Sequence, residues 1–150
     1  MESCTIILKG EFPMIQIIAG EQGEGKSKLL INMANQSIKT SKGNVVYLDH
    51  DRGHMFNLHH KIRFIEVNDF PISDYKQFFG FICGIISQDH DIENIYIDGL
   101  LKLTNLSLEE IHPFLDELKR ISKKYNVHFV IGISCKVKEI PDPLKTFLIA

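Results

Sequence analysis

Short runs of apolar, β-branched residues alternate with longer amphipathic segments along most of the chain. Five runs predict strands, over residues 14–19, 45–48, 62–67, 95–97 and 127–134, and residues 146–150 predict a sixth. Apolar residues that recur every three or four positions predict helices over residues 26–38, over residues 73–88 and between the fourth and fifth strands. This alternation predicts an α/β fold, a three-layer α/β/α sandwich around a mainly parallel sheet, with the partly polar run 62–67 as an edge or half-exposed strand.

Two of the predicted helices differ in how their apolar residues are distributed. The helix after the fourth strand has one apolar face, formed by Ile111, Phe114, Leu115, Leu118, Ile121 and Tyr125. Ser107 and Glu110 have the S-x-x-E spacing of a capping box ahead of it, and Pro113 either marks its first turn or kinks it. The helix over residues 73–88 is apolar on more than one side, through Phe78, Phe79, Phe81, Ile82, Ile85 and Ile86. Its breadth predicts burial in the core, with a subunit interface as the alternative.

Length and composition indicate one domain over residues 1–150. The hydrophobic content of 44% and the charged content of 24% are those of an ordinary globular protein. A net charge of −2 gives no electrostatic reason to expect nucleic acid or an anionic membrane as a partner. The cysteines Cys4, Cys83 and Cys135 form no CxxC pair, and the chain opens without a basic and then apolar leader. Since the apolar run 78–86 is too short to cross a bilayer, we expect a cytoplasmic protein without a membrane span.

The segment between the first strand and the first helix matches the phosphate-binding P-loop pattern G-x-x-x-x-G-K-[ST]. The residues that form it, with the lysine that follows, are Gly20, Glu21, Gln22, Gly23, Glu24, Gly25, Lys26, Ser27 and Lys28. Glycines let successive backbone N–H groups point at an anion, and the following helix adds its N-terminal dipole. Lys26 is then expected to contact the β- and γ-phosphates, and the Ser27 hydroxyl to coordinate Mg²⁺. The predicted ligand is a nucleoside triphosphate, ATP, with Mg²⁺.

Carboxylates follow two of the predicted strands. Asp98 ends the run 94–98, which has the form of a Walker B strand, and can hold a water molecule of the Mg²⁺ shell opposite Ser27. Asp49 and Asp51 follow the second strand, and both can face the same side if that strand stays extended. Either acid is then a candidate to orient and deprotonate the water that attacks the γ-phosphate. The alternative is a solvated acidic turn.

The order of these segments resembles the RecA-like ATPase core shared by recombinases, replicative helicases of the DnaB type and KaiC. The resemblance covers residues 14–134. Its last part, LDELKRISKKYNVHFVIGIS over residues 115–134, is similar to the helix, strand and polar sensor of those proteins. The resemblance implies Lys26 and Ser27 as ligands of phosphate and Mg²⁺, and it implies Asp98 as the Walker B acid.

The same resemblance assigns roles to two further residues. It implies that Asp51 activates the attacking water and that Ser134 senses the γ-phosphate. The family usually has Glu where Asp51 stands, so the carboxylate of this chain is one methylene shorter. The DNA-contacting loops of recombinases have no counterpart after the fifth predicted strand. The resemblance therefore implies nucleotide binding and does not extend to DNA strand exchange or unwinding.

Other P-loop classes match the sequence less well. The stretch VVYLDHD over residues 45–51 also resembles MinD/ParA-type partitioning ATPases, but Glu21 stands where those have an extra lysine. The N-K-x-D motif of GTPases is absent, and the arginines are too scattered for a kinase lid. The expected function is slow ATP hydrolysis by a motor or regulatory subunit. The alternatives are a regulatory module that binds ATP without significant hydrolysis and a MinD/ParA-like ATPase, and a homo-oligomer or a larger ATPase assembly is compatible with each.

Two clusters of basic residues also have competing interpretations. The histidines His50, His54, His59 and His60 crowd one segment, but their spacing matches no standard metal-ligand pattern, which favours a basic turn. Lys136 and Lys138 follow the fifth strand, where oligomeric RecA-like ATPases can present a cation to a neighbouring subunit. Two solvated lysines in a loop are the favoured interpretation.

Overall fold

A five-stranded, all-parallel sheet forms the centre of the molecule. The computed structural model describes residues 14–21 and 25–149. The strands are β1 (Ile15–Ala19), β2 (Asn44–Asp49), β3 (Arg63–Glu66), β4 (Ile92–Ile97) and β5 (His128–Ile133), in the spatial order β1-β5-β4-β2-β3. Every neighbouring pair is parallel, so all five carboxyl ends emerge at one edge of the sheet. Strand β3 lies at the end of the order, which confirms the predicted edge strand.

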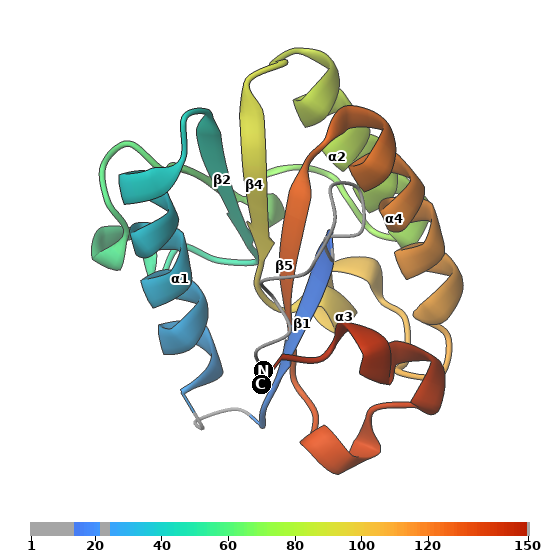
Figure 1. Cartoon of the computed structure of the whole chain (residues 1–150). Coiled ribbons are helices and arrows are strands. Elements are labelled where there is room, and N and C mark those ends of the chain that lie inside the picture. Colours follow the sequence, from blue (N-terminus) through green and yellow to red (C-terminus); the bar gives the residue numbers. More distant parts are fainter. Residues whose placement is uncertain (1–13, 22–24, 150) are drawn as a thin grey trace, which may run out of the picture.

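Helices cover both faces of this sheet. Helix α1 (Lys26–Thr40) lies on one face, and α2 (Tyr75–Ser87), α3 (Leu100–Thr104) and α4 (His112–Tyr125) lie on the other (Figure 1). Neighbouring residues of a strand point to opposite layers: Tyr96 packs with the α1 side, whereas Ile95 and Ile97 pack with the α2 and α4 side. The predicted α/β fold with helices on both sides of a parallel sheet is therefore observed.

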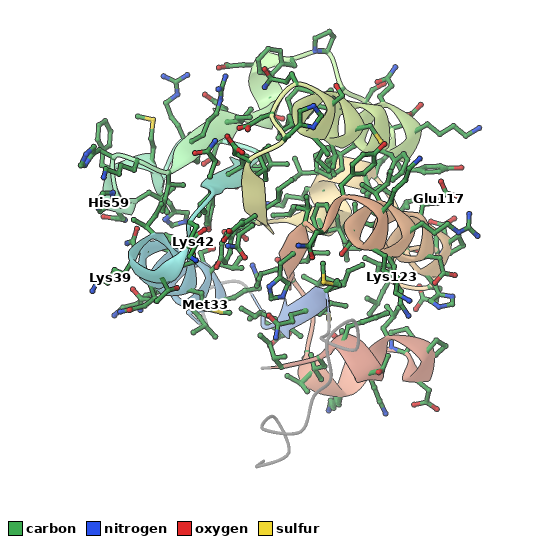
Figure 2. The ribbon with its side chains drawn as sticks, turned by 45° about the horizontal axis from the view of Figure 1, so that its top comes forward. Met33, Lys39, Lys42, His59, Glu117 and Lys123 are labelled. Carbon is green, nitrogen blue, oxygen red and sulfur yellow. The ribbon has the colours of Figure 1, made fainter. Side chains whose placement is uncertain are left out.

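The larger part of the core lies between the sheet and helices α2 and α4. Phe78 and Phe114 stack there with ring centroids 6.1 Å apart, and Phe79 meets Phe114 edge-on at the same distance. Phe81 packs against Phe70 at 5.4 Å. Core packing therefore accounts for the apolar sides of α2. On the outside of the molecule, polar side chains such as Glu117 and Lys123 extend from α4, and Lys39 extends from α1 (Figure 2).

The segment ahead of α4 differs from the predicted one. Ser107 and Glu110 do form a capping pair, in which the Ser107 N–H donates to Glu110 Oε1 at 2.9 Å. This pair closes a turn, however, and α4 begins only at His112, so Pro113 occupies the first turn of the helix and does not kink it. A proline is tolerated there because its missing N–H has no partner inside the helix. Helix α3 was not predicted, because five residues are too few for a periodic pattern.

The predicted sixth strand over residues 146–150 is wrong. Its first residues belong to a 3₁₀ segment, Asp142–Phe147, in which Leu144 is fully buried. Only a single bridge, between Leu148 and Ile17, continues the sheet, and the Ile149 N–H donates to the Ile17 carbonyl at 2.9 Å. The 3₁₀ turns leave too few extended residues for a ladder, and Ala150 lies outside the described residues.

None of the described helices combines the length and the apolar character that are needed to cross a bilayer.

Candidate functional site

A polar cleft of about 420 Å³ opens at the edge of the sheet where the strands end. The residues that line it come from the ends of β1, β2, β4 and β5 and from the segments that follow: Glu21, Gly25, Lys26, Ser27, Lys28, Asp49, His50, Asp51, His54, Asp98, Gly99, Lys102 and Ser134. Ligands of parallel α/β sheets bind at this edge. The structure thus brings together, at one cleft, the described residues for which the sequence predicted a role, with the exception of Gly20.

The described part of the predicted P-loop segment leads directly into the first turn of α1. Gly25 precedes the helix with a φ of +83°, a conformation that a residue with a Cβ rarely adopts. The first intrahelical bond runs from the Leu29 N–H to the Gly25 carbonyl, so the N–H groups of residues 26–28 have no partner within the helix. Free N–H groups and the helix dipole make this end of α1 attractive to an anion. Residues 22–24 of the predicted loop lie outside the described residues, and the Gly20 N–H donates to the Ile133 carbonyl at 3.2 Å.

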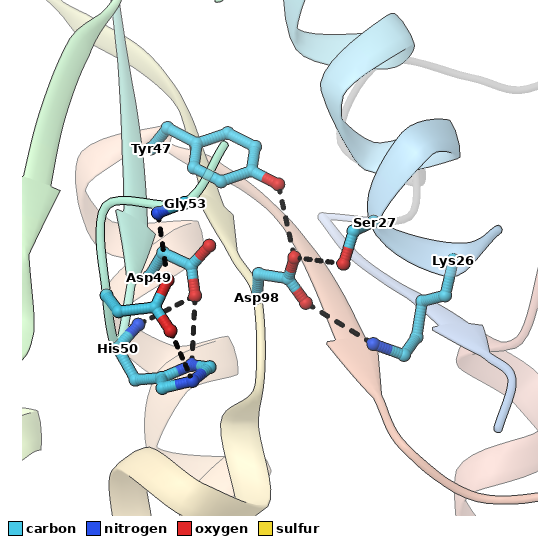
Figure 3. Close-up of polar contacts among 8 residues, drawn as sticks. Lys26, Ser27, Tyr47, Asp49, His50, Gly53 and Asp98 are labelled. Atoms are coloured by element: carbon cyan, nitrogen blue, oxygen red, sulfur yellow. Dashed lines mark hydrogen bonds and ion pairs between the residues drawn. The ribbon is translucent and has the colours of Figure 1, made fainter. Parts of the chain in front are cut away.

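Asp98 is the centre of the polar contacts in the cleft (Figure 3). Lys26 Nζ lies 3.3 Å from Asp98 Oδ1, and the Ser27 hydroxyl donates to Asp98 Oδ2 at 2.7 Å. The buried Tyr47 hydroxyl approaches the same Oδ2 at 3.4 Å. Asp98 directly follows β4, and Gly99 then takes a φ of +79°, which turns the chain into α3. The lysine, the serine and the acid predicted to act together therefore do meet.

Asp49 and Asp51 lie in different surroundings, although one residue separates them. Strand β2 ends at Asp49, and the chain bends immediately, so the condition of a strand that stays extended through Asp51 is not met. Asp49 is only 2% exposed, and its Oδ1 accepts the His50 N–H at 2.7 Å. Asp51 is exposed, and its Oδ1 accepts the Gly53 N–H at 2.9 Å.

The His50 ring lies between these two carboxylates. Its Nδ1 is 3.1 Å from Asp49 Oδ1, and its Nε2 is 3.0 Å from Asp51 Oδ2. Burial, with a further contribution from the nearby charge of Asp98, raises the pKa of Asp49 to about 6. The hydrogen bond from the Gly53 N–H lowers the pKa of Asp51. Asp49 can therefore accept or release a proton near neutral pH, whereas Asp51 stays ionised.

The oxygen and nitrogen donors of the cleft are of the kind that hold divalent cations. Ligand atoms of Asp49, His54 and Asp98 lie within 4.8 Å of one another. Hard carboxylate and hydroxyl oxygens, such as those of Asp98 and Ser27, suit Mg²⁺. Of the four clustered histidines, His50 and His54 line the cleft, while His59 and His60 stack on each other with ring centroids 4.5 Å apart.

Three residues of the site were not predicted from the sequence. Gly132 on β5 leaves room for the central pair, because a Cβ there would lie 2.7 Å from Leu30 Cδ1 and 3.3 Å from Asp98 Oδ1. A lone glycine inside an apolar strand is the signal that indicates such a close approach. Lys102 lines the cleft from α3, and Tyr47 reaches it from the middle of β2. Nothing in the local sequence distinguishes those two from a solvated lysine and a core aromatic residue.

The lysines after β5 lie apart from the site. Lys136 and Lys138 are exposed, and neither is among the residues that line the cleft. Their exposure is compatible both with solvated loop lysines and with a cation presented to a neighbouring subunit, so the two interpretations stay open. Ser134, the predicted sensor, does line the cleft, because β5 lies between β1 and β4 and so ends between the segment that follows β1 and Asp98.

Comparison with known proteins adds no identification to this geometry: no family model matches the chain, and no curated protein matches it.

Proposed function

We propose that the chain is a P-loop NTPase of the RecA-like type that binds ATP with Mg²⁺ and hydrolyses it slowly. The observation that carries the proposal is the meeting of Lys26, Ser27 and Asp98 at the N-terminus of α1. These residues come from a P-loop pattern and from the end of a strand that lies two places away in the sheet. A chance match to the loop pattern gives no reason for a buried acid to reach its lysine and its serine.

The charges of the cleft suit a phosphate chain only together with a cation. Three lysines line it, Lys26, Lys28 and Lys102, against the four carboxylates Glu21, Asp49, Asp51 and Asp98. A triphosphate adds further negative charge, so Mg²⁺ and the free N–H groups of α1 are needed to balance it. Mg²⁺ would be held by Ser27 directly and by Asp98 directly or through a water molecule. When bound, it would neutralise charge on the β- and γ-phosphate oxygens.

The residues of β2 supply the group that handles the attacking water. In hydrolysis, a water oxygen forms a bond to the γ-phosphorus, the bond to ADP breaks, and a base accepts the proton of the water. Asp49 suits this task better than Asp51, because it is buried in the cleft and its pKa is raised to about 6. Asp51 is exposed and faces His50, which supports a role in holding that ring.

The test is a nucleotide-binding and turnover assay on the purified protein. A fluorescent ATP analogue should bind in the presence of Mg²⁺ and be displaced by ATP. Phosphate release should fall to background in Lys26→Ala, and Asp49→Asn should lower the turnover number more than it weakens binding. Phosphate release that survives Lys26→Ala would come from a contaminant and would count against the enzyme. Absence of ATP binding to the wild type would refute the proposal as a whole.

One observation favours a second candidate, a regulatory module that binds ATP and scarcely hydrolyses it. Within the described residues, no arginine lines the cleft, and Lys102 is the only lysine that reaches it from outside α1. Phosphoryl transfer is slow without a cation aimed at the γ-phosphate. Tight ATP binding combined with wild-type turnover no faster than that of Lys26→Ala would identify the module.

Assembly into a homo-oligomer or a larger ATPase would supply such a cation from a neighbour. Light scattering with and without ATP·Mg²⁺ tests this, because a nucleotide-dependent increase in mass supports assembly and an unchanged monomer contradicts it. Light scattering also tests the alternative of a MinD/ParA-like ATPase. The resemblance to that class is weaker, because Glu21 stands where those proteins have an extra lysine.

A further inference from the structure

The ammonium group of Lys26 lies where a cation would be expected beside Asp98. Lys26 Nζ is 3.3 Å from Asp98 Oδ1, and the side chains are only 8% and 6% exposed. The other oxygen, Oδ2, accepts the Ser27 hydroxyl at 2.7 Å. Both carboxylate oxygens of Asp98 are thus engaged by donors of the chain itself, and the Ser27 hydroxyl is one of these donors (Figure 3).

A second buried carboxylate shares this environment. The Asp49 side chain is 3% exposed and lines the same cleft. Its Oδ1 accepts the His50 N–H, and within the described residues no donor reaches its Oδ2. Asp49 and Asp98 offer ligand atoms within 4.8 Å of each other, together with His54. Two buried carboxylates this close to each other repel, so a positive charge near them is favoured.

We propose that Lys26 serves as an internal counter-ion that occupies the cation position at Asp98 and blocks divalent-cation binding until a phosphate group draws the lysine away. The inference rests on the proposed function, because it assigns the arriving phosphate to the same lysine. In the nucleotide-free protein, the ammonium and the metal compete for one carboxylate. Movement of Lys26 to the phosphate leaves Asp98 and Ser27 free for the metal, with Asp49 as the nearest further carboxylate.

The consequence is reciprocal coupling between the two ligands. If a nucleotide raises the affinity of the protein for the cation, the cation must raise the affinity for the nucleotide by the same factor. Couplings of this kind commonly amount to about 5- to 150-fold. Lys26 therefore ensures that the free protein holds little divalent cation and that metal and nucleotide bind together.

The test uses Mn²⁺ alone, so it does not depend on nucleotide binding. Free Mn²⁺ is measured by electron paramagnetic resonance during titration of the nucleotide-free protein. Wild type should bind Mn²⁺ weakly, and Lys26→Met should bind it at least about fivefold more tightly. The double variant K26M/D98N should lose that gain, because the gain arises from the Asp98 carboxylate that Lys26 no longer occupies. Equal affinities of wild type and Lys26→Met would overturn the inference, and so would a gain that survives the change at Asp98.

Lys28→Met is the matched control for charge. Lys28 lines the same cleft from the same turn of α1, but it is exposed and makes none of the contacts to Asp98. Its removal should change Mn²⁺ affinity by less than about twofold, since exposed charges are well screened. A gain in Mn²⁺ affinity as large as that of Lys26→Met would mean that any positive charge in the cleft opposes Mn²⁺ binding. That result would also overturn the inference.

A substitute variant and a parallel measurement of nucleotide binding complete the experiment. If Lys26→Met does not fold cooperatively, as followed by circular dichroism, Lys26→Gln takes its place, because it removes the charge with a shorter side chain that keeps a polar end. Binding of the fluorescent ATP analogue to wild type is measured in parallel. If wild type binds the nucleotide but the Lys26 variants show no gain in Mn²⁺ affinity, only the counter-ion role of Lys26 is refuted. If the variants gain Mn²⁺ affinity but wild type does not bind the nucleotide, only the proposed function is refuted.

Discussion

At the scale of single residues, the cleft holds two neighbouring buried acids with different partners. Asp98 has an ammonium group, a hydroxyl and a phenol close to its oxygens. Asp49 has a backbone N–H and the ring of His50. Asp49 is buried and lies near the negative charge of Asp98, and for these two reasons its pKa rises.

The first prediction concerns the dependence of stability on pH. The pKa of Asp49 rises on folding from 3.8 to about 6, so the folded protein binds this proton more tightly than the unfolded chain does. The stabilising effect of protonation is complete below about pH 4 and is lost as the pH rises through 6. Asp49→Asn has no such proton to lose. Between pH 4 and pH 7, the free energy of unfolding of the variant should therefore gain about 1–3 kcal/mol relative to that of wild type.

Urea unfolding of both proteins from pH 4 to pH 7, in the presence of a chelator, measures this difference. Parallel stability profiles would show that Asp49 titrates normally. Asp51→Asn is the control, because Asp51 is exposed and the pKa of its carboxyl is lowered, so it should not reproduce the effect.

At the scale of elements, strand β5 determines how closely α1 approaches Asp98. Gly132 is the position at which the strand leaves space for Leu30 and for the Lys26–Asp98 pair. The strand pairs with β1 on one side and with β4 on the other, so it cannot move aside. A side chain at this position has to displace the contacts that form the site.

The second prediction is that Gly132→Ala destabilises the fold and weakens nucleotide binding together. The added methyl group should lower the free energy of unfolding by about 1–3 kcal/mol, as overpacking does in other cores. Gly80→Ala on α2 is the matched control, because nothing lies within 4 Å of its added Cβ. That change should stabilise the protein by about 0.5–1 kcal/mol, since alanine favours a helix. Denaturant unfolding decides, and equal effects of the two changes would contradict a tight contact at Gly132.

The third prediction concerns the two sides of α4. Leu118 is fully buried, whereas Glu117 extends outward and pairs with Arg120 at 3.3 Å (Figure 2). Leu118→Ala should lower the free energy of unfolding by about 2–5 kcal/mol, because it leaves a cavity beneath the helix. Glu117→Ala should change it by no more than about 0.5 kcal/mol. Chemical unfolding of both variants checks the orientation of α4, and a large effect of Glu117→Ala would contradict it.

At the scale of the whole molecule, the parallel arrangement gathers residues from four strand ends into one cleft. The strand order places β5 between β1, which precedes the predicted P-loop segment, and β4, which precedes Asp98, so Ser134 lies between the ends of both strands. A ligand in this cleft contacts segments that are distant in sequence and should therefore stabilise the fold as a unit.

The fourth prediction is that ATP with Mg²⁺ raises the melting temperature. At a ligand concentration of about 100 times Kd, binding adds about 2.7 kcal/mol, which corresponds to about 5–10 °C for a domain of this size. Differential scanning calorimetry measures the shift. ATP with a chelator should give a smaller shift, and Asp98→Asn should make the shifts with and without Mg²⁺ equal. A Mg²⁺ effect that persists in that variant would exclude Asp98 as a metal ligand.

The sequence by itself determined where the five strands and the three longer helices lie along the chain, and it placed the predicted P-loop segment at a strand-to-helix junction. These features rest on local patterns: apolar runs, helical periodicity, glycines and a fixed motif. The same local patterns identified Lys26, Ser27 and Asp98 as candidates. They failed where the chain is short or irregular, at α3, at the start of α4 and at the predicted sixth strand.

Only the tertiary structure decided which acid is buried and what surrounds it. Asp49 and Asp51 are equivalent in the sequence pattern. They differ in burial, because β2 ends at Asp49 and the chain then bends, which leaves Asp51 exposed. Gly132 and Tyr47 belong to the site because they lie close to Asp98 across the sheet, and Lys102 lines the cleft from α3. Such contacts depend on strand order and packing between distant segments, which local residue patterns do not encode.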